Sequence, residues 1–256
     1  MAHPGHEIYL RSWCREVQPY VSILTTGSRS GRSRDRIRFS ADLLQSWGCR
    51  PTPQFGSFED RALYDMVMQE KIDAIAAWRD EVAHFVHANA IDTVVVDAFQ
   101  GYSVAHDLAN ILARMAVVAA ERIGERQIEL CEFAPVPESL WPRDGTAMLH
   151  HERRLSQAEI EEKLMAAGDC DDLMSEVTWV SGLGDKDFLA SEKIHLAHKS
   201  WDRLPAAIPD YEKIGRERVA SGIYRFVLTG RHFAAAVAAL SRRQGARPVL
   251  AQAERV

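Results

Sequence analysis

The stretch TVVVDAFQGYSVAH, residues 93–106, decides the fold that this sequence predicts. It begins with β-branched residues, passes through a short polar turn and enters an almost wholly apolar stretch that continues to Ile123. Such a run followed by a long apolar stretch is typical of a buried strand and the helix that packs on it. Repetition of this unit builds a parallel α/β sheet.

Similar elements flank this unit on both sides. Two further runs, Tyr20 to Thr25 and Gln127 to Phe133, have the character of buried strands. Helices are expected at Glu7 to Val17, Ser33 to Trp47, Asp60 to Ala88 and Val104 to Ile123. The predicted fold class is therefore α/β, with a Rossmann-like, mainly parallel sheet flanked by helices.

The pattern is looser after Phe133. We expect a helix that Ser156 caps and that runs to Gly168, a polar irregular segment from Asp185 to Pro209, and a closing helix from Phe233 to Arg242. At 256 residues, one domain is the expected organisation. Residues 1–133 would form the core sheet and the metal loops of this single domain, and residues 134–256 its C-terminal part.

Composition excludes several functional classes. A net charge of -5 argues against nucleic acid as a partner, because proteins that bind it usually carry an excess of basic residues. No apolar stretch is long enough for a membrane span, and no secretory signal opens the chain. The four cysteines lack metal-ligand spacing, which favours reduced thiols in a cytoplasmic protein.

Three histidines are placed so that they can meet at one metal ion. His3 and His6 are three residues apart at an expected strand-to-helix turn, and His106 follows the strand that ends at Asp97. Both loops fall at the carboxyl ends of strands, where parallel α/β sheets bind ligands. Three imidazoles and a water form an open, catalytic zinc site. We predict one divalent ion, Zn2+, held by His3, His6 and His106, although three imidazoles also suit iron, nickel or copper.

The start of the chain is unusual for such a sheet. A core strand should precede His3, yet only Met1 and Ala2 do so. We expect either a start that lies too late or a sheet that lacks most of its first strand. In both cases residues Met1 to Pro4 should lie deep against the sheet.

The opening resembles the first motif of the PIG-L/LmbE family of zinc-dependent N-deacetylases. That motif reads His-Pro-Asp-Asp-Glu after the first strand, and this chain has His3-Pro4-Gly5-His6-Glu7. Residues 24–28 resemble the second strand and glycine loop of the family, and residues 101–106 its later histidine motif. The resemblance covers roughly the first half of the chain. It implies hydrolysis of an N-acyl group by a metal-activated water.

The motif departs from the family where chemistry is expected. The resemblance implies that His3 and His106 bind the metal. His6 stands at the position of the metal aspartate, Gly5 at that of the aspartate base, and Ser103 at that of a histidine that helps to stabilise the oxyanion. The metal site is expected to survive with three nitrogen ligands, whereas the usual base is missing.

Two carboxylates could replace this base. Asp97, our first candidate, ends a strand beside the His106 loop and could take a proton from the water, or could simply cap the loop. Glu7, our second, adjoins His6, and it could instead favour a helix N-terminus or orient a ligand imidazole.

Basic and polar side chains near these loops are candidate substrate contacts. An arginine run, Arg29, Arg32, Arg34, Arg36 and Arg38, could clamp a phosphate or carboxylate, or could be a solvated loop and helix start. We predict substrate contacts at Arg34, Arg36, Tyr102 and Ser103. Two other histidine pairs, His84 with His87 and His195 with His198, have a helical spacing that could hold a metal, but neither has an identifiable third ligand. His150 and His151 are expected in a solvated loop.

The sequence thus predicts a metal-dependent hydrolase that resembles N-acetyl-sugar deacetylases. Its substrate would be a small molecule or glycoconjugate with an N-acyl group. An alternative from another class is a protein that keeps the fold, and with it the metal, but has lost hydrolysis and acts as a binding or partner protein. Gly5 and Ser103 favour that alternative. A third reading is a metal enzyme of different chemistry, because histidine in place of aspartate makes the site softer and more positive.

Overall fold

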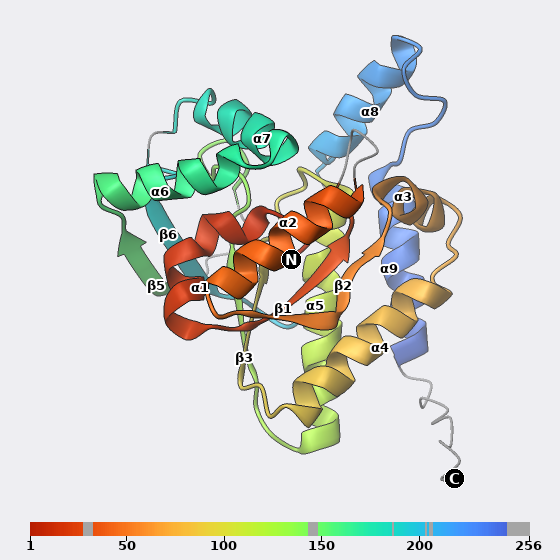
Figure 1. Cartoon of the computed structure of the whole chain (residues 1–256). Helices are drawn as coiled ribbons and strands as arrows, with labels where there is room; N and C mark the ends of the chain where they lie inside the picture. Colours follow the sequence, from red (N-terminus) through yellow and green to blue (C-terminus); the bar gives the residue numbers. More distant parts are fainter. Residues whose placement is uncertain (28–32, 143–147, 186, 203, 205–206, 245–256) are drawn as a thin grey trace.

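Two short sheets lie at the centre of the computed structural model, which describes residues 1–27, 33–142, 148–185, 187–202, 204 and 207–244 (Figure 1). In the first sheet, β1 (Tyr20–Thr25) pairs parallel with β2 (Arg50–Phe58). The second has the order β3-β4-β6-β5, formed by β3 (Thr93–Asp97), β4 (Glu129–Phe133), β6 (Ser191–Leu196) and β5 (Leu149–Arg154). β3 and β4 are parallel, whereas β6 is antiparallel to both of its neighbours. The predicted α/β class is confirmed, with the parallel pairing confined to part of the sheet.

Residues Met1 and Ala2 fill the space between the two sheets. The Leu24 amide donates to the Met1 carbonyl at 3.0 Å, and the Thr25 amide donates to the Ala2 carbonyl at 2.9 Å. On the other side, the Ala2 amide donates to the Asp97 carboxylate at 2.9 Å. Ala2 is fully buried, as expected for a segment deep against the sheet. These contacts bring the opening loop to the carboxyl ends of β1 and β3.

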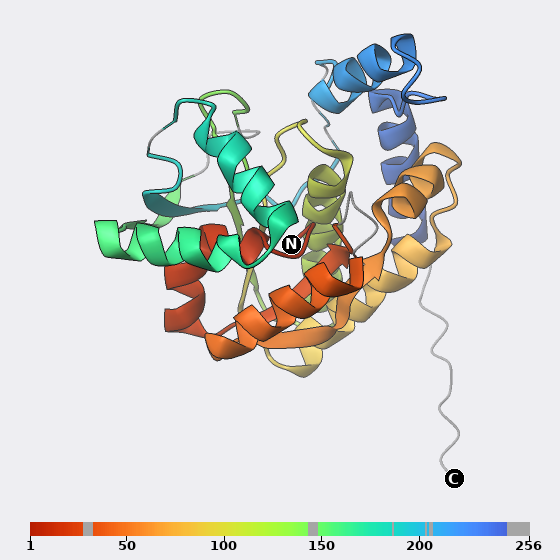
Figure 2. The same ribbon diagram turned by 45° about the horizontal axis from the view of Figure 1, so that its top comes forward.

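Helices cover both faces of the sheets. The N-terminal half of the chain contributes η1 (His6–Leu10), α1 (Arg11–Val17), α2 (Ser33–Ser46), α3 (Asp60–Met68), α4 (Asp73–Ala88) and α5 (Val104–Gly124). The C-terminal half contributes α6 (Gln157–Gly168), α7 (Asp171–Ser181), α8 (Asp210–Ala220) and α9 (Gly230–Gln244). In both views α6 and α7 lie on the side of the sheets away from α4 and α9, while α8 projects from the body (Figures 1 and 2).

Two hydrophobic clusters form the core, one on each side of the sheets. One gathers apolar residues of α3, α4, α5 and α9, including Leu63, Ile75, Leu112 and Leu240. The other joins η1, β1, α2 and α7, including Ile8, Ile23, Leu44 and Leu173. Because α5 is buried along most of its length, its first turn is held firmly at the end of β3. The loop between them therefore has a fixed place in the fold.

Several elements differ from the sequence predictions. The expected helix over 60–88 is two helices, because the chain turns between Met68 and Asp73 with Glu70 in a left-handed conformation. The strand β2 was missed because Pro51, Pro53 and Gly56 disfavour strands. Strands β5 and β6 and helix α7 were also missed, and the first two hold His150, His151 and His195, which had been expected in a loop and a helix. The cap at Ser156 is confirmed, with Glu159 completing a capping box.

Two global properties follow from the described residues. All four cysteines are free thiols. Within the described part of the chain, each helix is too short or too polar to cross a lipid bilayer.

Candidate metal centre

The three histidines of the predicted metal site do come together. The ring centroids of His3 and His6 are 5.2 Å apart, those of His3 and His106 are 5.0 Å apart, and those of His6 and His106 are 4.9 Å apart. His3 and His6 lie on the loop that leaves the Met1–Ala2 segment, and His106 lies in the first turn of α5. His6 and His106 are buried, and the His3 side chain is 14% exposed.

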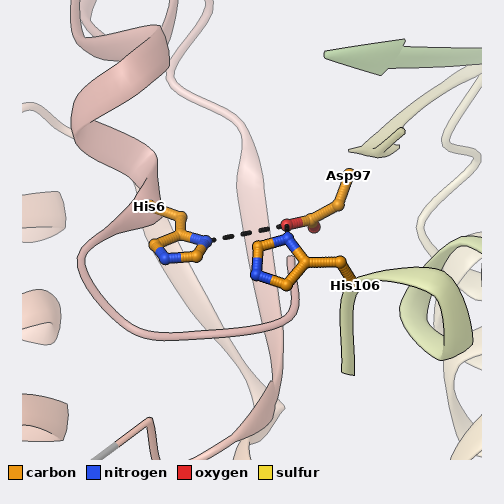
Figure 3. Close-up of side chains that lie close together, drawn as sticks. All are labelled: His6, Asp97 and His106. Carbon is orange, nitrogen blue, oxygen red and sulfur yellow. Dashed lines mark ion pairs between the residues drawn. The ribbon is translucent and has the colours of Figure 1, made fainter. Parts of the chain in front are cut away.

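Asp97 joins the histidines at the centre of the group. His6, Asp97 and His106 are all buried, and each offers a ligand atom within 4.8 Å of the other two (Figure 3). The Asp97 Oδ1 atom lies 3.7 Å from the His6 Nδ1 atom and 3.2 Å from the His106 Nδ1 atom. None of these three atoms has a hydrogen-bond partner. A buried polar atom without a partner is costly, so three that face one another indicate a common ligand.

The spacing of these atoms suits a metal ion. Ligand atoms about 2.0–2.2 Å from a tetrahedral ion lie about 3.3–3.6 Å from one another. The two distances from Asp97 Oδ1, 3.2 and 3.7 Å, bracket this range. Two imidazoles and one carboxylate are also a ligand set that zinc accepts in catalytic sites, where a fourth position stays open. The residues present therefore fit a divalent ion.

His3 is held in one orientation by Thr25 and Asp60. The Thr25 hydroxyl donates to the Ala2 carbonyl, so its oxygen accepts a hydrogen bond from His3 Nδ1 at 2.6 Å. The Asp60 Oδ1 atom lies 3.3 Å from the same nitrogen. Asp60 is fixed in turn because the Gly27 amide donates to its other oxygen at 2.9 Å. His3 thus carries its proton on Nδ1, and its Nε2 lone pair is left for a metal or a proton.

The charge of Asp97 is stabilised strongly. Burial acts to raise its pKa, but the adjacent imidazoles of His106 and His6 and the nearby chain terminus outweigh this effect and hold the pKa well below its usual value. The same burial lowers the pKa of His3 and of His106. A carboxylate with so low a pKa stays ionised and is a good ligand. One of its oxygens accepts from the Ala2 amide and the other lies between two imidazoles, an arrangement that favours a ligand role over the predicted role as the catalytic base.

Glu176 of α7 lies against this group of side chains and was missed by the sequence analysis. Its Oε2 atom lies 3.4 Å from His6 Nε2, on the edge of the ring opposite Asp97. Burial alone would lower the pKa of His6, but the carboxylates of Asp97 and Glu176 more than compensate and raise it. No motif marks Glu176, because it lies in the segment with the weakest pattern. Only the packing of α7 brings it to the site.

Glu7 stabilises the opening loop instead of facing the three histidines. It is fully buried, the Gly5 amide donates to its Oε2 atom at 2.8 Å, and the Ser40 hydroxyl donates to its Oε1 atom. Both carboxylate oxygens are therefore occupied, one by the turn that carries His6 and the other by α2. This contact fits the orienting alternative and disfavours a role as the base.

The predicted substrate arginines have different environments. Arg36 is buried, pairs with Glu176, and donates to the carbonyls of Pro4 and Gly27, so its guanidinium is used within the protein. Arg34 is exposed on α2. Arg29 and Arg32 lie outside the described residues. Of the two predicted contacts, only Arg34 has a side chain that faces solvent.

Tyr102 and Ser103 lie at the edge of the site. The ring centroids of Tyr102 and His106 are 6.2 Å apart. Tyr102 is also stacked on Trp179 of α7, with 5.7 Å between their ring centroids. Trp141 contacts both of these rings. Trp179 is 41% exposed, so this group of three aromatic rings forms an apolar rim beside His106. Ser103 is the N-cap residue of α5, and its side chain makes no capping hydrogen bond.

The other histidines lie apart from this centre. His84 is exposed on α4, and His198 is within 3.3 Å of Arg114. His150 of β5 forms a second group with Glu129 and Cys131 of β4, in which His150 Nε2 is 3.6 Å from Glu129 Oε2. His150 and Glu129 are exposed, whereas Cys131 is buried and its thiol pKa is raised to about 12, chiefly by burial. A protonated thiol is a poor ligand, so this group fits a metal less well.

Comparison with known proteins assigns no family. No family model matches the chain, and no curated protein matches it significantly. A crystal structure of a deacetylase triple mutant involved in the teicoplanin biosynthetic pathway is similar, with 11% identity and a TM-score of 0.49. The match covers 79% of this chain and 98% of that chain. A similarity this distant carries no conclusion about activity, which has to be inferred from the side chains of the site.

Proposed function

We propose that this protein is a metal-dependent hydrolase that removes an N-acyl group from a small molecule or glycoconjugate. The observation that supports the metal is the convergence of three buried atoms, one each from His6, Asp97 and His106, that lack hydrogen-bond partners. The acyl substrate is proposed from the resemblance of residues 3–7 to the N-deacetylase motif. A bound divalent ion, with zinc as the first candidate, would polarise the acyl carbonyl and acidify a water molecule.

We assign the ligand role to His6, Asp97 and His106, which leaves an open position for the substrate or water. This assignment exchanges the roles that the sequence suggested for His3 and Asp97. Asp97 supplies the single negative charge of the set, and its other oxygen stays bound to the Ala2 amide. The backbone carbonyl of Asp97 accepts from Asn110 at 2.7 Å, which ties the ligand to α5.

His3 is the proposed general base. Its Nδ1 proton is held by Thr25 with Asp60 beside it, so Nε2 accepts the proton of the attacking water. An imidazole oriented by a carboxylate is a common general base, and such help typically contributes about a hundred- to ten-thousand-fold in rate. Gly5, at the position of the family base, has no side chain that could compete for this role.

The test separates the ligands from the base. His106→Ala should remove most bound zinc, as measured by metal analysis of the dialysed protein. His3→Gln should keep the zinc and lower hydrolysis of an N-acetyl amino sugar, the first substrate to assay, by at least about tenfold. Full zinc content in His106→Ala would contradict the ligand set, and loss of zinc in His3→Gln would make His3 a ligand.

The alternative of a binding or partner protein that has lost hydrolysis is still supported by Gly5 and Ser103. If the zinc-loaded protein hydrolyses no N-acyl substrate but still binds zinc through His106, the binding role becomes the better account.

A further inference from the structure

We propose that Glu176, which α7 places against His6, is a positioning residue of the metal centre, so that metal binding and the docking of α7 stabilise each other. This inference rests on the ligand set of the proposed function. It goes beyond that set because α7 lies about 170 residues along the chain from the motif that it supports and belongs to none of the motifs that suggested the site.

Glu176 is held rigidly where it meets His6. Both of its oxygens accept from Arg36, each at 2.9 Å, in a two-point ion pair. Arg36 also donates to the Pro4 carbonyl at 2.9 Å and to the Gly27 carbonyl. Arg36 therefore links α7 to the loop that carries His3 and His6. A buried guanidinium with this many fixed partners leaves Glu176 little freedom to move.

The contact with His6 has a direct consequence for metal binding. With Glu176 at Nε2, the neutral His6 ring carries its proton on Nε2 and directs the Nδ1 lone pair toward Asp97 and His106. Metal-binding histidines generally donate their other ring N–H to a carboxylate or carbonyl group in this way, which fixes the ring and increases its basicity. Glu176 acts through His6 and is not itself a ligand in this arrangement.

Two further contacts join α7 to the site. Leu173 packs on Gly5, where a Cβ atom would lie 3.0 Å from Leu173 Cδ1. Trp179 stacks on Tyr102, which precedes His106 by four residues. One face of α7 thus touches both loops that supply ligands. By thermodynamic linkage, if docking of α7 favours the metal-binding orientation of His6, metal binding must favour docking of α7 to the same extent.

The first measurement is the zinc affinity of the full chain, determined by competition with a chromophoric chelator. Glu176→Ala should weaken zinc binding by about 10- to 100-fold, the usual effect of losing such a partner. Glu176→Gln should retain part of the affinity, because its amide oxygen still accepts from His6 Nε2. Ser175→Ala, an exposed change on the same helix, is the matched control and should bind zinc like the wild type.

The pair of Glu176 variants distinguishes positioning from simple docking. Both changes remove the ion pair with Arg36, so equal losses in the Ala and Gln variants would mean that Glu176 only anchors α7. That outcome, or an unchanged affinity in the folded Glu176→Ala protein, overturns the proposal and leaves the proposed function intact. Failure of the wild type to bind zinc would overturn both.

The second measurement follows α7 itself by hydrogen exchange. Zinc should slow exchange of amides in residues 171–181 of the wild type, and should slow it much less in Glu176→Ala. Amides of α4, which is remote from the site, serve as the internal control. Equal protection of α7 by zinc in the two proteins would show that the coupling does not pass through Glu176.

Discussion

Asp97 shows how much one side chain contributes to this molecule. One oxygen accepts the Ala2 amide, which connects β3 to the opening segment, and the other lies between His6 and His106. The residue is fully buried, and its charge is stabilised by these neighbours. The structure therefore uses a single carboxylate both to join the two sheets and to face the candidate metal position.

Replacement of Asp97 tests both contributions. Asp97→Asn should lose most of its affinity for zinc, because an amide oxygen is a neutral and weaker ligand than a carboxylate. It should also lower the free energy of unfolding, by about 1–3 kcal/mol, since a buried charge-assisted network is broken. Zinc titration and urea unfolding measure the two effects. If the Asp97→Asn protein had unchanged zinc affinity, Asp97 would not be a ligand, and its role as the catalytic base would be favoured again.

Asp107 should give the protein a distinct pH dependence. It is fully buried at the start of α5, and burial raises its pKa to about 7 even though the amides of Gln100 and Gly101 donate to it. The unfolded chain releases this proton near pH 4, at about the reference pKa of aspartate, whereas the folded chain keeps it to about pH 7. The folded state binds more protons in this range, so stability falls as pH rises through it.

The matched variant is Asp107→Asn, which keeps an oxygen that accepts from both amides. Urea unfolding at several pH values should show a slope that is shallower than that of the wild type, by up to about 1.4 kcal/mol per pH unit. Identical slopes in the two proteins would mean that Asp107 titrates normally.

At the scale of elements, the turn between Ala2 and η1 depends on a glycine. Gly5 has a φ of 95° in this turn, a conformation that other residues rarely adopt, and Leu173 of α7 packs on its face. The side chain of another helix thus fills the space beside position 5, so the glycine of this turn and the docking of α7 are two aspects of one packing arrangement.

Substitution of Gly5 should therefore destabilise the protein. Gly5→Ala is expected to lower the free energy of unfolding by about 1–3 kcal/mol through backbone strain, with a further contribution from contact with Leu173. Gly168→Ala, at the end of α6 where an added Cβ meets nothing within 4 Å, is the control and should be neutral or slightly stabilising. The measurement is the urea concentration at the midpoint of unfolding in each variant. Equal midpoints for Gly5→Ala and Gly168→Ala would contradict the expected backbone strain at position 5.

At the scale of the whole molecule, the candidate metal centre lies where separate parts of the chain meet. The opening loop, the end of β3, the start of α5 and the side of α7 all supply residues to it. Figure 3 shows the three proposed ligands approaching from these different directions. A metal ion bound here would join elements from both sides of the sheets, so its binding should stabilise the fold as a unit.

Zinc should accordingly raise the melting temperature. At a free zinc concentration 100 times the Kd, the gain is about 2.7 kcal/mol, which corresponds to roughly 5–10 °C for a chain of this size. A chelator should reverse the gain. His106→Ala should show no such shift, and an equal shift in that variant would place the stabilising zinc elsewhere, for example at the group of Glu129, Cys131 and His150.

Local signals in the sequence determined a large part of this protein. The β-branched runs ended at the observed bounds of β1 and β3, and the apolar stretch after Ser103 predicted α5, because short-range periodicity reports which face of an element is buried. The same patterns predicted that His3, His6 and His106 lie at one edge of the sheet.

The tertiary structure decided the rest. Strands β2, β5 and β6 depend on pairing with distant partners and carry weak local patterns. The roles of Asp97, Glu7 and Arg36, and the presence of Glu176, depend on which atoms meet after packing, and sequence spacing does not encode those contacts between segments far apart in the chain.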